Sequence, residues 1–220
     1  MKLFGSRHSL ATYRVRVVMA LKGLHAEEVS IDLMKGEQHG EDYVTVNPQH
    51  VVPTLVLDDN GPPLTQSLAI MEYLDEAHPH PPLLPASPRE RAWVRALALI
   101  VVADGHPLIT PRVTTFLEKE LLQDRGACRR WMAHWTMSTL EAMERYLRRA
   151  PTGRYCYGDA VTLADVCLVS QVIGAVAFFQ CDTRPVPTVM QIYEDCMRLE
   201  AFAQTPAPQQ TAATLAQAPT

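Results

Sequence analysis

The first 127 residues of this 220-residue chain contain no cysteine. Disulfide frameworks use even numbers of cysteines, and zinc sites use closely spaced pairs. Here the number is odd and no C-x-x-C pair occurs, so we expect no metal site and no disulfide framework, but buried, reduced thiols. The five cysteines are Cys128, Cys156, Cys167, Cys181 and Cys196.

The chain also lacks a basic excess and a long apolar run. Its formal net charge is −4, which gives no electrostatic footprint for nucleic acid. No uninterrupted apolar stretch approaches the ~18 residues that a membrane span needs. Lys2-Leu3-Phe4 follows Met1 without the pattern of a signal peptide. We therefore expect a cytoplasmic protein with no nucleic-acid and no membrane partner.

The first 79 residues predict a mixed α/β domain. Its strand segments are short and apolar or alternate in polarity, and its helix segments carry apolar residues on one side. Asp59-Asn60-Gly61 is a strong hairpin turn. The order β-α-β followed by β-β-α predicts a four-stranded sheet with parallel and antiparallel pairing. The predicted strands are 2–6, 29–33, 54–57 and 64–66, and the helices are 9–23 and, capped by Ser67, 67–78.

A proline-rich stretch, HPHPPLLPASPRE, then separates two regions of different pattern. Five prolines between Pro79 and Pro88 exclude a helix or a central strand there and indicate an extended linker. Ser87 at the N-cap and Pro88 at the first position start a helix, and helix patterns continue to about Phe202. We predict domains at 1–79 and 89–203, a linker at 80–88 and a disordered tail at 204–220.

The segment G-D-A-V-T-L-A-D, residues 158–165, contains a helix start within the all-helical half. Thr162 can cap a helix while the carboxylate of Asp165 reaches back to the N–H of Thr162, which is a capping box. The apolar residues that follow predict a buried central helix. We interpret this motif as structural.

The stretch Q-H-V-V-P-T-L-V-L places Pro53 at the mouth of an apolar strand. Proline has no N–H for a sheet and usually lies at strand starts, edges and bulges. One interpretation is an ordinary strand start with a trans peptide bond. The other is that the backbone beside Pro53 is kept open for a ligand.

In this order the motifs resemble the cytosolic glutathione S-transferases over about residues 2–202, and within them the zeta class, which comprises the maleylacetoacetate and maleylpyruvate isomerases. The resemblance implies a thioredoxin-like N-terminal domain, an all-helical C-terminal domain, glutathione as cofactor and a homodimer. The stretches that carry it are Tyr13–Val17, Ala20–Gly23, Asn47–Gln49, Val52–Leu55, Gln66–Ile70 and the capping-box motif.

The resemblance also implies how glutathione is held. Pro53 is expected in the cis form, with the main chain of Val52 pairing with the cysteinyl backbone as an added strand would. The helix start at Ser67 favours the γ-glutamyl carboxylate, and Gln66 is a donor to the same arm. The candidates for the glycyl carboxylate are Lys35, Gln38, His39 and Gln49.

The chemistry is expected at the first helix. Because the N-terminal half has no cysteine, the reactive sulfur must come with the ligand, and a hydroxyl at a helix N-terminus can stabilise its thiolate. Ser9 is the main candidate donor, with an ordinary N-cap as the alternative role, and Thr12 is a second donor. Further candidates contact the substrate acid or its developing enolate. These are Arg7, His8, His106 and Arg112, with Phe178 lining the second-substrate pocket.

Two departures from the family pattern leave the second substrate open. The usual S-S-C-S quartet is Ser9-Leu10-Ala11-Thr12 here, and Q-V-x-x-A-x-R-F has become QVIGAVAFFQ, without its arginine. Cis–trans isomerisation of a maleylacetoacetate- or maleylpyruvate-type acid is the first hypothesis. The alternatives are a glutathione transferase for a more apolar electrophile and a non-catalytic interaction module with this fold. Dehalogenase-like or reductase chemistry comes last.

Overall fold

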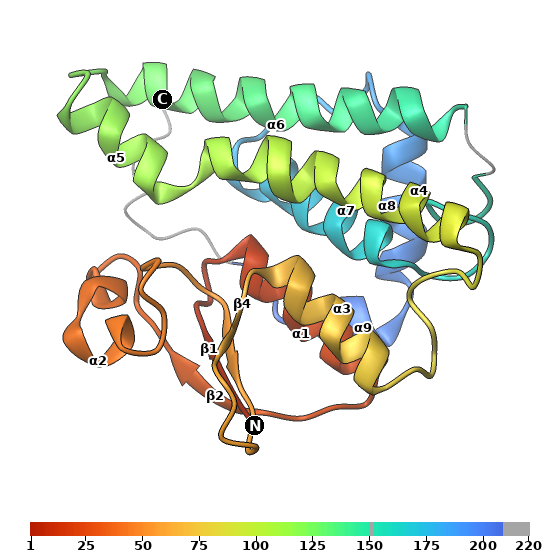
Figure 1. Ribbon diagram of the computed structural model, residues 1–220. Coiled ribbons are helices and arrows are strands. Elements are labelled where there is room, and N and C mark those ends of the chain that lie inside the picture. The colour runs from red at the N-terminus through yellow and green to blue at the C-terminus, as the bar shows by residue number, and fades with distance from the viewer. Residues whose placement is uncertain (150–151, 209–220) are drawn as a thin grey trace. The chain divides into compact units, whose positions relative to one another are not determined.

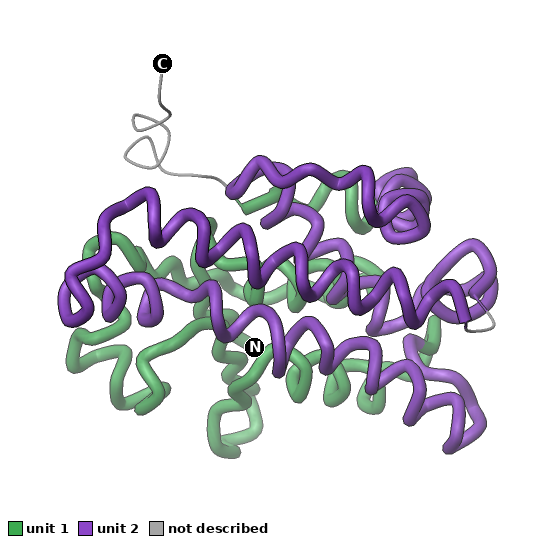
Figure 2. Tube along the Cα trace, turned by 90° about the horizontal axis from the view of Figure 1, so that it is seen from above, with its two compact units in different colours: residues 1–82, 200–220 green, residues 83–199 purple. Residues whose placement is uncertain are grey.

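The computed structural model of the protein describes residues 1–149 and 152–208. The chain forms two compact units (Figure 2), which are described separately. Unit 1 contains residues 1–82 and the described residues from Glu200 onward, and unit 2 contains the described part of 83–199. The domain limits predicted from the sequence stay predictions, and residues 209–220 of the expected disordered tail lie outside the described residues.

Unit 1 is built on a four-stranded mixed sheet, as predicted (Figure 1). The strand order is β2-β1-β3-β4; β1 and β2 are parallel and the other neighbours are antiparallel. The helices α1 (Leu10–Leu21) and α3 (Ser67–Ala77) pack against each other. The strands are β1 (Lys2–Gly5), β2 (Glu27–Ser30), β3 (Thr54–Val56) and β4 (Leu64–Thr65).

The second strand begins and ends earlier than the prediction of 29–33. Its parallel register with β1 pairs Lys2 with Glu27 and Gly5 with Ser30, so the ladder ends where β1 ends. Residues 31–33 continue the polarity alternation in the sequence, but in the structure they lie beyond the end of the strand. Two short helical elements that the sequence analysis missed follow: η1 (Glu37–His39) and α2 (Glu41–Val44).

The core of unit 1 lies around α1. Tyr13, Val15 and Val18 on this helix are fully buried, as are Leu3 and Leu55 on the sheet. Burial of such side chains contributes roughly 1.5–3 kcal/mol each. The short helix α9 (Glu200–Ala203) also belongs to this unit, and the hydroxyl of Tyr13 donates to the carbonyl of Phe202 at 3.5 Å.

Unit 2 is helical, as the sequence predicts, and Ser87 occupies the N-cap position before its first helix. The helix α7 is buried along its whole length and lies beside α4 and α8. The sequence of α7 is apolar on all sides, and such a helix is expected to be buried among other helices. The elements are α4 (Pro88–Leu99), the π-helix η2 (Ile100–Gly105), η3 (His106–Ile109), α5 (Pro111–Lys119), α6 (Arg125–Leu147), α7 (Leu163–Ile173), the π-helix η4 (Gly174–Phe178) and α8 (Pro187–Met197).

The predicted capping box at the start of α7 is present. The carboxylate of Asp165 accepts from the N–H of Thr162 at 2.8 Å and from the N–H of Cys156 at 2.7 Å. Asp165 is fully buried, and this burial raises the pKa of its carboxyl although the hydrogen bonds oppose the shift. The motif therefore fixes the loop before α7 as well as the helix start.

The cysteines are free thiols, and all but the half-buried Cys181 are buried. Burial raises the pKa of the Cys156 and Cys196 thiols, which makes them poor nucleophiles. This agrees with the expectation of buried, reduced thiols. None of them belongs to unit 1.

The helical run from Pro88 to Lys119 is long and apolar enough to cross a membrane by length and composition. Core helices of globular proteins pass the same test, and a third of its most apolar window, 33%, is buried inside the protein. The expectation of no membrane partner stays a prediction.

Candidate functional site

Ser9 lies at the junction between β1 and α1. It is the N-cap of α1, and its Oγ accepts from the backbone N–H of Thr12 at 3.1 Å. The hydroxyl of Thr12 is fully buried and accepts from the N–H of Ser6 at 3.3 Å. Since its Oγ only accepts in the N-cap bond, Ser9 keeps its hydroxyl proton for a ligand. Both donor roles stay predictions.

The Val52–Pro53 peptide bond is cis, and both residues are buried. Within the described residues, neither the N–H nor the carbonyl of Val52 has a hydrogen-bonding partner. An unpaired main-chain donor and acceptor beside the antiparallel strand β3 can accept an extended peptide as a further strand.

A hydrogen-bond network that the sequence analysis missed holds this segment. The carbonyl of Val51 accepts from the hydroxyl of Tyr43 at 2.6 Å and from Nδ2 of Asn47 at 2.8 Å. Asn47 Nδ2 also donates to Oγ1 of Thr54 at 3.0 Å. The side-chain amide of Asn47 therefore holds the residue before Val52 and the residue after Pro53. Burial raises the pKa of Tyr43, which keeps it a neutral donor. In the sequence, the motif Asn47-Pro48-Gln49 is the signal that could have indicated this network.

The start of α3 differs from the prediction in one detail. Ser67 is the first helical residue rather than the N-cap, because the chain leaves β4 through Gln66, whose φ is positive at 66°. The first helix bond runs from the N–H of Ile70 to the carbonyl of Gln66, so the N–H groups of residues 67–69 precede it. Together with the helix dipole, these N–H groups are able to bind a carboxylate at the start of α3, where Ser67 is buried.

Gln66 and Gln49 are joined directly: Nε2 of Gln66 donates to Oε1 of Gln49 at 2.8 Å. This bond connects the start of α3 with the segment that precedes Val52. The structure therefore brings the predicted residues Gln49, Val52, Pro53, Gln66 and Ser67 together in unit 1.

The remaining predicted residues of unit 1 lie on two segments, 7–8 and 35–39. Lys35 pairs with Asp32 at 3.7 Å, and a hydrogen bond from the Met34 N–H is the largest cause of the lowered pKa of Asp32. Gln38 and His39 lie on η1. Arg7 is exposed and its Nε lies 3.1 Å from Nε2 of the half-buried His8.

Three predicted residues belong to unit 2. His106 is the first residue of η3, Arg112 is exposed on α5, and Phe178 ends η4, where it meets Phe179 edge-on at 6.1 Å. Their roles toward a second substrate stay predictions.

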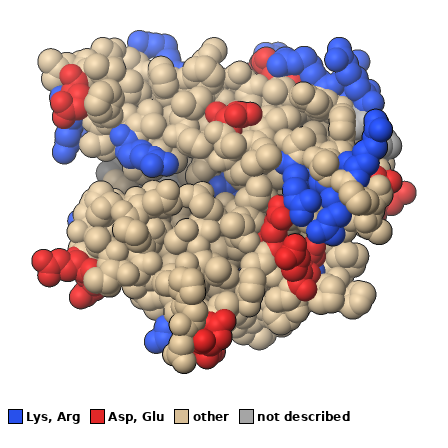
Figure 3. Space-filling view, viewed as in Figure 1, with Lys and Arg blue, Asp and Glu red and all other residues tan. Residues whose placement is uncertain are grey.

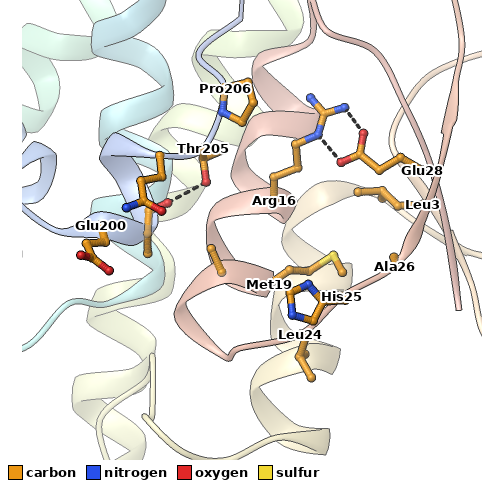
Figure 4. A pocket seen from close by; sticks show the side chains of 13 residues that line it. Leu3, Arg16, Met19, Leu24, His25, Ala26, Glu28, Glu200, Thr205 and Pro206 are labelled. Atoms are coloured by element: carbon orange, nitrogen blue, oxygen red, sulfur yellow. Dashed lines mark hydrogen bonds and ion pairs between the residues drawn. The ribbon is translucent and has the colours of Figure 1, made fainter.

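A cavity of about 380 Å³ opens elsewhere in unit 1 (Figure 4). Arg16 on its wall is bound by both oxygens of Glu28, at 2.6 and 2.8 Å, and His25 and Met19 lie on another side. None of the predicted site residues, all of which the structure describes, lines this cavity. It is separate from the cluster around Val52 and Ser67.

The cluster fits a peptide-like cofactor with a thiol and carboxylates. The unpaired main chain of Val52 offers one donor and one acceptor, the start of α3 offers N–H groups for a carboxylate, and the Ser9 hydroxyl offers a donor. Among the described residues, no group of three or more His, Cys, Asp or Glu is placed to hold a metal ion.

Comparison with known proteins gives consistent matches. Residues 1–76 match the glutathione S-transferase N-terminal domain. The chain is 40% identical to a probable maleylacetoacetate isomerase of Vibrio cholerae over 204 residues, 92% of this chain and 93% of that protein.

Two solved structures are similar along nearly the whole chain. One is a maleylacetoacetate isomerase of Methylobacterium extorquens with bound malonate and glutathione: the identity is 44%, the TM-score 0.91, and the match covers 96% of this chain and 98% of the other. The second is a holo maleylpyruvate isomerase, a bacterial zeta-class glutathione S-transferase, with 39% identity, a TM-score of 0.89 and coverage of 94% and 97%.

Proposed function

The chain belongs to the zeta class of the glutathione S-transferase family, and on that premise we propose that it is a glutathione-dependent cis–trans isomerase of a maleylacetoacetate- or maleylpyruvate-type acid. Glutathione is its cofactor: when bound, it supplies the thiolate nucleophile that the first half of the chain lacks. The protein must therefore bind this tripeptide, keep its sulfur ionised and stabilise charge on the substrate.

In this proposal the main chain of Val52 pairs with the cofactor backbone, and Gln66 with the start of α3 binds the γ-glutamyl carboxylate. Ser9 donates its hydroxyl proton to the sulfur, while the N–H of Thr12 holds the Ser9 oxygen in place at 3.1 Å. A hydroxyl donor at a helix start favours the charged form of a nearby thiol, which lowers its pKa toward neutral pH.

The substrate acid carries carboxylates and develops enolate charge, so it needs cationic or donor groups. We assign Arg7 and His8 in unit 1 to this task, together with His106 and Arg112 of unit 2. Phe178 gives the second-substrate pocket an apolar wall where the family pattern has arginine.

The observation that carries the proposal is the unpaired main chain of Val52, in a unit that also contains the start of α3 and the N-capping Ser9, in a chain related along its length to isomerases. The test compares turnover of maleylacetoacetate, maleylpyruvate and 1-chloro-2,4-dinitrobenzene with glutathione. We expect turnover of a maleyl acid. Turnover of the aryl halide alone indicates a conjugating transferase, and no turnover together with no retention on a glutathione column indicates a non-catalytic module.

We further propose a cytoplasmic homodimer in which α3 of one copy faces α4 of the other. Basic side chains gather where α4 begins and α6 ends (Figure 3). Tyr73 on α3 and Leu99 on α4 are exposed apolar side chains that a second copy would cover. Light scattering should give twice the chain mass of 24.5 kDa, and a monomer would contradict this assembly.

A further inference from the structure

The cavity of about 380 Å³ in unit 1 has no role in the function proposed above. Its volume lies in the range of about 300–1,000 Å³ that is usual for small-molecule sites. It is bounded by the second half of α1, by the segment 24–26 with β2, and by α9 with residues 204–206 (Figure 4). All of these segments belong to unit 1, so the cavity is complete within that unit.

Much of the wall of this cavity is apolar. Leu3 and Met19, which line it, are almost completely buried, at 1% and 5% exposure. Figure 4 shows Met19 and Leu24 at one end of the cavity, with Arg16 and Thr205 toward the other. A ligand that fits has an apolar body at the first end and a polar head group at the second.

Arg16 supplies hydrogen-bond donors at the polar end. Its Nε and Nη2 bind the two oxygens of Glu28, at 2.8 and 2.6 Å, whereas its Nη1 has no hydrogen-bonding partner among the described residues. The Arg16 side chain is only 16% exposed. The bidentate pair with Glu28 fixes the plane of the guanidinium, so the N–H groups of Nη1 are held in place for an acceptor.

Thr205 supplies an acceptor at the same end of the cavity (Figure 4). Its hydroxyl donates to the carbonyl of Ala201 at 2.6 Å, which leaves the lone pairs of Oγ1 for a ligand. Thr205 is buried, at 8% exposure. One donor and one acceptor at the same end match a carboxamide, which has a carbonyl oxygen and an NH₂ group.

The charges on the wall disfavour an ionic head group. Besides His25, the ionisable side chains that line the cavity are Arg16, Glu28 and Glu200. These three groups carry one positive and two negative charges, which repel an anion. A cationic head group has no acceptor for Nη1 of Arg16 and lies beside its positive charge. A neutral head group avoids both penalties.

We propose that this cavity is a second, non-catalytic ligand site, which binds a small neutral aromatic carboxamide. The carbonyl oxygen of the ligand accepts from Nη1 of Arg16, its NH₂ group donates to Oγ1 of Thr205, and its ring packs against Met19 and Leu24. The ligand and glutathione bind at the same time, because none of the residues assigned to glutathione lines the cavity. The site is independent of the function proposed above.

The test uses titrations followed by saturation-transfer NMR at pH 7 with nicotinamide, nicotinate and 3-picolylamine, which share one ring and have a neutral, an anionic and a cationic head group. Ala20→Trp fills the cavity from an exposed position on α1. Arg16→Lys keeps a cation for Glu28 but removes the fixed donors of Nη1. Ala86→Trp, at an exposed alanine of unit 2, is the matched control.

We expect the wild type and Ala86→Trp to bind nicotinamide on the order of tenfold more tightly than either charged pyridine. Arg16→Lys should weaken nicotinamide binding by a similar factor, and Ala20→Trp should abolish it at an unchanged thermal unfolding midpoint. Saturating glutathione should leave the binding unchanged.

Three results would each overturn the inference. They are no binding of nicotinamide to the wild type, equal binding to the wild type and Ala20→Trp, and displacement of nicotinamide by glutathione. Arg16→Lys provides a test that does not depend on the folding of Ala20→Trp: unchanged nicotinamide binding in this variant excludes the assigned head-group contact. Turnover of a maleyl acid tests the proposed function separately, so the two can fail independently.

Discussion

Lys22 and Asp75 form a buried ion pair at the end of α1, with Nζ 2.6 Å from Oδ1. The Lys22 side chain is completely buried, at 0% exposure, and that of Asp75 is 8% exposed. The same ammonium donates to the carbonyls of His78, at 2.7 Å, and Pro81. One cation therefore ties α1 to the end of α3 and to the start of the proline-rich stretch.

Replacement of Lys22 by Met should destabilise the protein by about 3–5 kcal/mol, since it takes from the buried Asp75 carboxylate the ammonium that pairs with it. Urea unfolding measures this change. The double variant Lys22→Met with Asp75→Leu should recover part of the loss, because it removes the buried carboxylate together with its ammonium. Equal stability of the single variant and the wild type would show that the pair contributes nothing.

Ser9 has a capping role and a proposed catalytic role, which two variants can separate. Ser9→Ala removes the acceptor for Thr12 and should cost about 1 kcal/mol. Ser9→Asp keeps an N-cap acceptor, but it cannot donate to a thiolate and repels it. Both should lower kcat/KM on the order of 100-fold, whereas only Ser9→Ala loses stability. Full activity of Ser9→Asp would exclude a hydroxyl donor at this position.

Asn47 is predicted to position Val52 without touching the substrate. Asn47→Ala removes the donor shared by Val51 and Thr54 and should weaken glutathione binding several-fold. The same variant should leave kcat at saturating glutathione close to that of the wild type, because Ser9 is not affected. Calorimetry and steady-state kinetics measure the two effects, and a loss confined to kcat would contradict a positioning role.

Asp165 should make stability depend on pH. Its folded pKa is raised by burial above the ordinary value of 3.8, so its contribution is fully present below that value and is lost as pH rises through the folded pKa. Asp165→Asn does not titrate. The free energy of unfolding of the wild type minus that of Asp165→Asn should therefore fall as pH rises above the ordinary pKa of 3.8 and through the raised folded pKa. A difference that stays constant or rises with pH would contradict the raised pKa.

The sequence predicted the elements whose signals are local. Alternating polarity, the turn at Asp59–Gly61 and the Thr162–Asp165 pair predict the mixed sheet and the start of α7, because each depends on neighbours in the chain. The limits of β2 depend on its register with β1, and η1 with α2 carries no strong periodic pattern.

The parts of the candidate site that the sequence did not predict are set by contacts between distant segments. Gln66 takes the N-cap position of Ser67 because of the turn out of β4. The bond from Gln66 to Gln49 and the contact of His39 with His50 join side chains that no single motif contains. Resemblance to a family supplied the roles of Ser9 and Val52, which local patterns alone left open.

The most direct test of the central claim follows the olefinic protons of maleylpyruvate by NMR with enzyme and glutathione at one-hundredth of the substrate concentration. The proposal predicts complete conversion of the cis acid to the trans acid, with all glutathione recovered as free thiol. Conversion that stops after one equivalent of glutathione, with a stable adduct, or no conversion at all, would contradict an isomerase that uses glutathione as its cofactor.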